Sequence, residues 1–140
     1  MNSHKLQKTF SMIKPDAHRK NCALNILDYI SKAGFNILKL EYRQLSKDEI
    51  VSLYEEHKHK PFFGEICDFI SSHPVLLLVL EREDAVAHLR EIMGSTNSAN
   101  AHPTSIRGQY GDKTIIMHNV IHGSDSEASA QREMKIFGLS

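Results

Sequence analysis

Four strand-like apolar segments, separated by segments of helical periodicity, predict an α/β (α+β) domain. The segment order is strand, helix, strand, short helix, strand, helix, long loop, strand and helix, which indicates a four-stranded antiparallel sheet with helices packed on one face, the ferredoxin-like class. The 140 residues contain no internal repeat and no linker rich in Pro, Gly or Ser. Residues 1–140 are therefore expected to form a single domain.

The first expected strand and helix lie close to the amino terminus. Thr9–Ile13 is a short apolar run that ends before Pro15. The next segment, Ala23–Ala33, has apolar residues at helical spacing and is followed by Gly34, a residue that commonly ends helices. The residues expected on its buried face are Ala23, Leu24, Leu27, Ile30 and Ala33.

The next expected elements are a strand and two short helices. Phe35–Leu45 alternates between apolar and polar residues well enough to be a strand. Ser46 and Glu49 have the spacing of a capping box, which predicts that a helix begins there. A further short helix is expected at Glu65–Ser71.

The second half of the chain is expected to hold two strands, two helices and a long loop. Pro74–Glu81 is continuously apolar, as is typical of a strand buried on both faces, and a helix is expected at Glu83–Gly94. Ser95–Lys113 is rich in Ser, Asn, His, Pro and Gly and is predicted to be a loop, whose length indicates a functional role. The last strand is expected at about Ile116–Ile121, followed by a helix that begins at Ser124 or the next residue.

Composition argues against several classes of protein. Lys plus Arg and Asp plus Glu both number 17, so there is no basic excess to attract a nucleic-acid backbone. Cys22 and Cys67 lack metal-type spacing and suit reduced thiols better than a disulfide. The amino terminus has no apolar signal core, and the apolar run Val75–Leu80 is too short to cross a membrane. We expect a cytoplasmic protein that binds neither nucleic acid nor membrane.

The stretch NVIHGSDSE places His122 between an apolar run and an expected helix. Ser124 and Glu127 repeat the capping-box spacing, and a helix amino terminus at this place would attract phosphate. Glu133 lies about two and a half helical turns beyond Ser124, from where its carboxylate could face back and orient the imidazole. A histidine that stood alone would more often be a structural or surface residue.

Other polar and aromatic residues indicate a site for a nucleotide. Lys14 follows the first strand within IKPDA and is placed either to bind phosphate or ribose or to be an ordinary exposed lysine. Arg90 and Arg107 have guanidinium groups that suit polyphosphate oxygens, although each alone would more often be solvated. Phe62 and Phe63 are either both core residues or one core residue and one exposed platform for a base. There is no Walker loop, so a P-loop mechanism has no support.

The segments TFSMIKPDA, YEEHKHKPFFGE, LREIMGSTN, SIRGQYG and NVIHGSDSE resemble those of nucleoside diphosphate kinases, in order and spacing, across nearly the whole chain. The resemblance implies transfer of the γ-phosphate of a nucleoside triphosphate to a nucleoside diphosphate through a phosphohistidine at His122. It also implies ping-pong kinetics, a role in nucleotide-pool balance, Mg²⁺ held mainly by the nucleotide phosphates, and a dimer-based homo-oligomer, either a tetramer or a hexamer. Ser124 and Glu133 match the hydroxyl and the carboxylate that support the histidine.

The same resemblance implies roles for the other candidate residues. Lys14 matches the family lysine that contacts the ribose hydroxyls and the transferring phosphate, and Asn119 matches its ribose partner. Tyr54 matches the tyrosine that reaches the phosphates near the nucleophile. Phe62 matches the aromatic residue that stacks on the base, a contact that implies little base selectivity. The residues that match the remaining phosphate ligands are His57, Arg90, Thr96 and Arg107.

Some residues differ from those that are common in the family, where glycine or proline is more usual. They are Ala23, His73, Ser98 and Thr104. A non-glycine residue at a left-handed position costs about 1 kcal/mol or more. Ser98 and Thr104 flank the matched ligands Thr96 and Arg107, so they are expected to reshape the phosphate loop.

Two alternative functions compete with this one. The first is a catalytically weak homologue that acts as a nucleotide-binding regulatory module or as a phosphohistidine donor to a protein; the complete set of matched ligands disfavours it. The second is metal binding by the nine histidines. His57 and His59 are the closest pair in the sequence, and their spacing places them on different sides of a helix, which disfavours a metal site.

Overall fold

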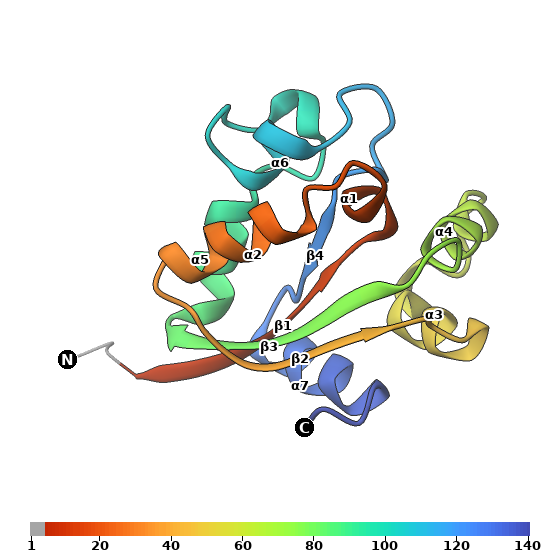
Figure 1. Cartoon of the computed structure of the whole chain (residues 1–140). Helices are drawn as coiled ribbons and strands as arrows, with labels where there is room; N and C mark the ends of the chain where they lie inside the picture. Colours follow the sequence, from red (N-terminus) through yellow and green to blue (C-terminus); the bar gives the residue numbers. More distant parts are fainter. Residues whose placement is uncertain (1–4) are drawn as a thin grey trace.

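The computed structural model describes residues 5–140, and the first four residues of the predicted 1–140 domain lie outside the described residues. Four antiparallel strands form one sheet in the order β2-β3-β1-β4 (Figure 1). The strands are β1 (Leu6–Ile13), β2 (Asn36–Arg43), β3 (Val75–Glu83) and β4 (Ile121–Gly123). The predicted ferredoxin-like class is confirmed.

Helices cover both faces of the sheet, so the expectation of a single covered face is wrong. Residues of α1, α2, α5 and α6 pack on one face, and residues of α3, α4 and α7 pack on the other (Figure 1). The helices are α1 (Pro15–Arg19), α2 (Ala23–Lys32), α3 (Lys47–Leu53), α4 (Phe63–Ile70), α5 (Ala85–Met93), α6 (Ile106–Tyr110) and α7 (Glu127–Ile136).

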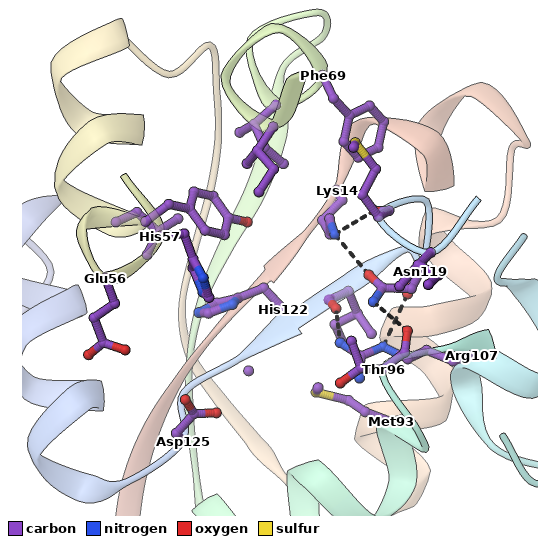
Figure 2. Close-up of a pocket in the computed structure, with 18 of the residues that line it drawn as sticks. Lys14, Glu56, His57, Phe69, Met93, Thr96, Arg107, Asn119, His122 and Asp125 are labelled. Carbon is purple, nitrogen blue, oxygen red and sulfur yellow. Dashed lines mark hydrogen bonds between the residues drawn. The ribbon is translucent and has the colours of Figure 1, made fainter. Parts of the chain in front are cut away.

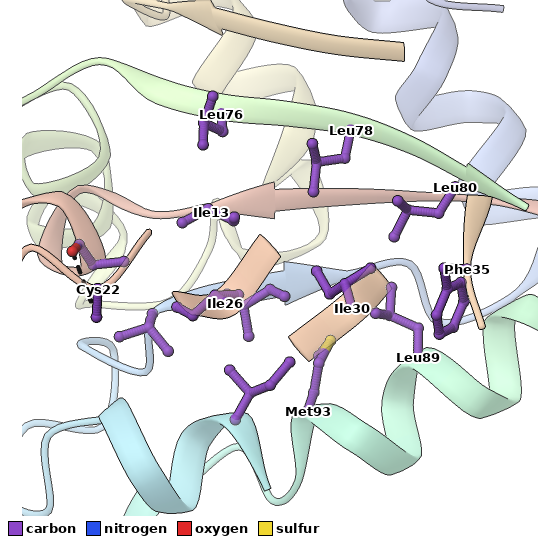
Figure 3. Close-up of a cluster of buried hydrophobic side chains, with 14 of the residues drawn as sticks. Ile13, Cys22, Ile26, Ile30, Phe35, Leu76, Leu78, Leu80, Leu89 and Met93 are labelled. Atoms are coloured by element: carbon purple, nitrogen blue, oxygen red, sulfur yellow. Dashed lines mark hydrogen bonds between the residues drawn. The ribbon is translucent and has the colours of Figure 1, made fainter. Parts of the chain in front are cut away.

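The central strand β3 explains why both faces must be covered. Leu76, Leu78 and Leu80 point into the apolar cluster under α2 and α5 (Figure 3). Val75, Leu77 and Val79, the alternate residues, point into the cluster on the other face. As expected from its continuously apolar sequence, this strand is buried on both faces.

Local sequence signals set several helix ends as predicted. Ser46 Oγ accepts a hydrogen bond from the Glu49 N–H at 3.1 Å, and the Glu49 carboxylate accepts one from the Ser46 N–H at 2.9 Å, so the capping box of α3 is present. Gly34 adopts a left-handed φ of +91° just after α2.

Cys22 and Cys67 are free thiols. Throughout residues 5–140, none of the helices has the length and apolar character needed to cross a membrane.

The carboxy-terminal half differs from the prediction in the long loop and in the last strand. The expected loop Ser95–Lys113 contains a short 3-10 helix, Ser98–Asn100, and helix α6. The strand expected at Ile116–Ile121 is wrong, because β4 begins only at Ile121. The Asp112 carboxylate accepts hydrogen bonds from the backbone N–H groups of residues 114 and 115, at 2.7 and 2.9 Å. This turn directs the apolar run that follows it away from the sheet.

The start of the last helix also differs. Helix α7 begins at Glu127, and its cap is Ser126, whose Oγ accepts a hydrogen bond from the Ser129 N–H at 3.0 Å. The predicted capping box of Ser124 and Glu127 is therefore wrong. The Ser124 side chain is fully buried and donates to Glu133 instead, so it is not available to cap the helix.

The expected backbone strain at the family departures is also absent. Asn21, Asp84 and Val120 are the only non-glycine residues between 5 and 140 with positive φ. Ser98 is buried at the start of its 3-10 helix, and Thr104 is exposed, with its N–H bonded to His102. Neither these two residues nor Ala23 and His73 adopt a conformation that requires glycine.

Candidate active site

A pocket of about 1000 Å³ opens beside β4 and contains every predicted site residue except Ser124. Figure 2 shows part of its lining, including Lys14 and His122. These residues come from different elements of the fold: Lys14 follows β1, Arg90 lies on α5, and Glu133 lies on α7. The other predicted residues in the pocket are Tyr54, His57, Phe62, Thr96, Arg107, Asn119 and His122. Segments that are far apart in the sequence therefore meet at one site.

The imidazole of His122 is held in a defined orientation. Its Nε2 lies 2.7 Å from Glu133 Oε1, and its side chain is 21% exposed. An ionised carboxylate can only accept hydrogen bonds, so Nε2 carries the hydrogen and Nδ1 carries the free lone pair. The backbone of His122 is fixed as well, because Ser11 Oγ donates to its carbonyl at 2.8 Å. The contact expected between Glu133 and the imidazole is thus present.

Glu133 is itself anchored behind the pocket. It is 5% exposed, and its Oε1 accepts a second hydrogen bond from Ser124 Oγ at 2.8 Å. Arg132 Nη2 lies 3.7 Å from Oε2, while Arg132 Nη1 donates to the carbonyl of Ser52. Ser124 therefore reaches the site indirectly, through the carboxylate that orients the ring.

Tyr54 and His57 line the pocket close to His122. The Tyr54 ring centroid is 6.1 Å from that of His122 and 6.4 Å from that of His57. Burial, with a smaller contribution from nearby Glu133, raises the pKa of Tyr54, so its phenol stays neutral and can donate a hydrogen bond. Nδ1 of His57 is buried and has no hydrogen-bond partner within the described chain, and its ring points into the pocket (Figure 2).

Lys14 is buried, which excludes the alternative of an ordinary exposed lysine. It is 8% exposed, and its Nζ donates to the Met117 carbonyl at 2.7 Å and to Asn119 Oδ1 at 2.8 Å. The Asn119 amide in turn donates to the Thr96 carbonyl at 2.9 Å. Burial lowers the pKa of Lys14 to about 7, although nearby Asp16 acts in the opposite direction.

The two arginines of the site differ in their environment. Arg107 is buried and donates to the carbonyls of Ile121 at 2.7 Å, Gly94 at 3.1 Å and Asn119 at 3.4 Å. Burial, together with nearby Arg90, lowers the pKa of Arg107 to about 10, which leaves it charged near pH 7. Arg90 is exposed and forms an ion pair of 2.9 Å with Asp125.

Exposed apolar side chains also line the pocket. Phe62 is 42% exposed, and Lys60 Nζ lies 5.6 Å from its ring centroid, while Phe63 is half-buried. Ile115 and Ile116 line the same pocket and are also exposed. Sequence reasoning missed both isoleucines as site residues. The turn signal of an aspartate followed two residues later by a threonine, at 112 and 114, could have indicated that they leave the sheet.

Comparisons with known proteins agree with the sequence resemblance. A family model described as "Nucleoside diphosphate kinase" matches residues 7–138. The nucleoside diphosphate kinases of Geotalea uraniireducens and Halalkalibacterium halodurans are 44% and 43% identical over 132 residues, which cover 94% of this chain and 95% and 88% of theirs.

The similar solved structures are also nucleoside diphosphate kinases. A nucleoside diphosphate kinase from Aquifex aeolicus matches with a TM-score of 0.88 and 39% identity, covering 95% of both chains. A halophilic nucleoside diphosphate kinase from Halobacterium salinarum, in complex with CDP, matches with a TM-score of 0.90 and 34% identity, covering 95% of this chain and 88% of the other.

Proposed function

Because the chain belongs to the nucleoside diphosphate kinase family, we propose that it transfers the γ-phosphate of a nucleoside triphosphate to a nucleoside diphosphate through a phosphohistidine at His122. The observation that carries the proposal is the hydrogen bond between His122 Nε2 and Glu133, because it leaves the Nδ1 lone pair free at the pocket. We also propose that residues 1–140 form one such domain, since both apolar clusters pack on a single sheet.

In the first half-reaction, His122 Nδ1 forms a bond to the γ-phosphorus. The bond from that phosphorus to the bridging oxygen breaks, and its electron pair leaves with the nucleoside diphosphate. The ring then carries positive charge, which the adjacent Glu133 carboxylate stabilises while Nε2 keeps its hydrogen. In the second half-reaction, a terminal oxygen of another nucleoside diphosphate attacks the same phosphorus and releases Nδ1, so ping-pong kinetics follow.

The cationic side chains stabilise the anionic phosphates during both transfers. Lys14 and Asn119 are joined by a hydrogen bond, which supports a shared role at the ribose and the transferring phosphate. Among the described residues, Arg90 forms its ion pair with the exposed Asp125, so a bound polyphosphate can compete for its guanidinium group. The other groups proposed to contact phosphate are Tyr54, His57, Thr96 and Arg107.

We further propose Mg²⁺ as the cofactor, carried mainly by the nucleotide phosphates. This ion prefers oxygen ligands and is commonly held by substrate phosphates together with one or two carboxylates. Among the pocket carboxylates, Glu133 is engaged with His122. Glu56, and Asp125 once a polyphosphate has replaced it at Arg90, would contact the hydrated ion (Figure 2). When bound, Mg²⁺ neutralises part of the phosphate charge.

The β2 strand supports a dimer-based homo-oligomer, either a tetramer or a hexamer. Among the described strands, β2 pairs only with β3, so its outer edge is open. Its exposed side chains include Ile37, Leu38, Leu40 and Tyr42. A second β2 strand, antiparallel about a two-fold axis, would cover this edge. We propose a cytoplasmic role in nucleotide-pool balance for this assembly.

Sedimentation velocity tests the proposed contact. We expect Leu40→Lys to dissociate the assembly, whereas Leu6→Lys, which changes an exposed leucine on β1, is expected to leave it intact. A wild-type protein that sediments as a monomer at micromolar concentration would contradict the proposed oligomer.

The covalent intermediate tests the proposed activity. Incubation with ATP and no acceptor should add one phosphoryl group per chain, labile to acid and stable to alkali, and later addition of GDP should remove it and form GTP. Intact-mass spectra follow both steps, and His122→Ala is the control. A protein without an adduct, or an adduct that persists in His122→Ala, would contradict the proposal and favour the regulatory module.

A further inference from the structure

The chain makes a strained turn immediately before His122. The Ile121 N–H donates to the Asn119 carbonyl at 2.8 Å, so residues 119–121 form a three-residue γ-turn. The central residue, Val120, has a φ of +62°. A β-branched residue rarely adopts this left-handed conformation, because its side chain clashes with the backbone. The surrounding structure must therefore hold the turn in place.

The segment that follows β1 holds both backbone polar groups of Val120. The Val120 N–H donates to Asp16 Oδ2 at 3.0 Å, and the Lys14 N–H donates to the Val120 carbonyl at 2.8 Å. Asp16 is 4% exposed and does not line the pocket. Arg107 holds the turn from the other side through the carbonyls of residues 119 and 121.

We propose that Asp16 is a positioning residue for phosphoryl transfer, because its carboxylate fixes the γ-turn that places Asn119 on one side and His122 on the other. The proposal rests on the function proposed above. Asn119 directly precedes Val120, and His122 follows it by two residues, so a rotation of the Val120 backbone moves the ribose ligand and the nucleophile together. A displacement of the nucleophile by about 1 Å is enough to slow an enzyme on the order of 10²-fold.

The second oxygen of the same carboxylate supports a role beyond local structure. Asp16 Oδ1 is buried and has no hydrogen-bond partner among the described residues. A buried, unsatisfied carboxylate oxygen is costly. Its negative charge lies near Lys14 and opposes the lowering of that pKa by burial, so Asp16 also favours the charged form of a proposed phosphate ligand.

A purely structural role must be separated from this one, because Asp16 also lies in the first turn of α1, where a carboxylate is favourable. Asp48 occupies the equivalent place in α3 and lies outside the pocket, so Asp48→Ala is the matched control. We expect Asp16→Ala to slow formation of the phosphohistidine on the order of 10- to 10²-fold, as for other groups that orient a catalytic residue from behind. Asp48→Ala is expected to lower only stability.

The conservative variant distinguishes the hydrogen bond from the charge. Asp16→Asn keeps an acceptor for the Val120 N–H, so its rate is expected to stay within about tenfold of the wild-type rate. Its nucleotide affinity is expected to decline at lower pH than in the wild type, because the charge that favours protonated Lys14 is lost. Asp16→Ser, whose side chain is too short to reach Val120, replaces the alanine variant if that variant does not fold.

Amide exchange measured by NMR gives a readout that does not depend on activity. The Val120 amide hydrogen should exchange slowly in the wild type and in Asp16→Asn, and faster in Asp16→Ala or Asp16→Ser. Unchanged Val120 protection with wild-type rates in the folded alanine or serine variant would overturn the role of Asp16. An Asp16→Asn variant that forms the phosphohistidine as slowly as Asp16→Ala would also overturn it. A wild-type protein without a phosphohistidine would overturn the proposed function instead, while the exchange data would still test how the turn is held.

Discussion

The pocket residues proposed to bind or transfer phosphate, termed the phosphate end, and those proposed to contact the base, termed the base end, are held in opposite ways. At the phosphate end, Lys14, Arg107 and Glu133 are buried and hydrogen bonded to the backbone or to other side chains of the site. At the base end, Phe62 and Ile116 are exposed apolar side chains that present surfaces without directed polar groups.

This difference indicates where the structure imposes precise geometry. Charge that develops during phosphoryl transfer is best stabilised by groups whose positions are fixed in advance. A base, in contrast, can bind by stacking, which accepts any aromatic face. The phosphate end should therefore be sensitive to small changes, and the base end tolerant of them.

The largest effect is expected at the nucleophile. His122→Ala should abolish transfer between nucleotides, because no neighbouring side chain in NVIHGSDSE forms the same labile intermediate. Nucleotide binding should persist, since none of the hydrogen bonds of Lys14 and Arg107, two proposed phosphate ligands, involves the histidine side chain. Coupled assays measure transfer, and calorimetry measures binding. Residual transfer above one-thousandth of the wild-type rate would contradict the proposed intermediate.

The next largest effect is expected behind the nucleophile. Glu133→Gln keeps the shape of the side chain but removes the charge that stabilises a positive imidazole, so the rate is expected to fall by about 10² to 10⁴-fold. Rapid mixing with ATP measures the phosphorylation step directly. Glu127→Gln, an exposed change in the first turn of the same helix, is the matched control.

Folding must be verified for this variant, because Glu133 also binds Ser124 and so joins α7 to the sheet. Circular dichroism and the unfolding midpoint provide the check. If a folded Glu133→Gln protein phosphorylates itself as fast as the wild type, another residue orients His122.

The sequence predicted which residue types gather at the phosphate end, because the chemistry of phosphate binding restricts them. It did not predict how they are held. The burial of Lys14 and Arg107 depends on the turn at residues 117–121, whose carbonyls accept their hydrogen bonds, and no local pattern announces that turn. Ser124 has the spacing of a cap, yet its hydroxyl bonds to Glu133, a tertiary contact that overrides the local preference.

The base end was predicted less completely for a different reason. Phe62 was identified through the resemblance, but Ile116 was placed in a strand because it belongs to an apolar run. The side-chain hydrogen bonds of Asp112 turn the chain before that run and leave the isoleucine exposed. Because of this turn, Ile116 lines the pocket, whereas its hydrophobic pattern assigned it to the sheet.

A change of pH is expected to have a smaller effect, which acts on nucleotide affinity. Burial lowers the pKa of Lys14 to about 7, so the free protein loses this charge as the pH rises through neutrality. Bound polyphosphate favours the charged form and raises that pKa, so binding takes up a proton above about pH 7. Nucleotide affinity should then fall with rising pH, by at most about tenfold per pH unit. Calorimetry in two buffers with different ionisation enthalpies measures the uptake.

The nucleotide phosphates titrate near the same pH, so a control is needed. Lys14→Met removes the ammonium group and retains the titration of the nucleotide. Proton uptake above pH 7 that is equal in both proteins would show that Lys14 does not titrate there.

The smallest effect is expected from exchange of the base. Phe62 offers a stacking face, and Ile116 offers only apolar contact, so neither reads the hydrogen-bonding edge of a base. Specificity constants for the common nucleoside diphosphates should therefore lie within about tenfold of one another, or ~1.4 kcal/mol. Phe62→Ala should raise KM for all of them together, whereas Phe62→Tyr, which keeps the ring, should not. Lys60 Nζ lies 5.6 Å from the centroid of this ring, so a strict preference for one base that disappears in Lys60→Met would show that the base end reads the hydrogen-bonding edge of its ligand.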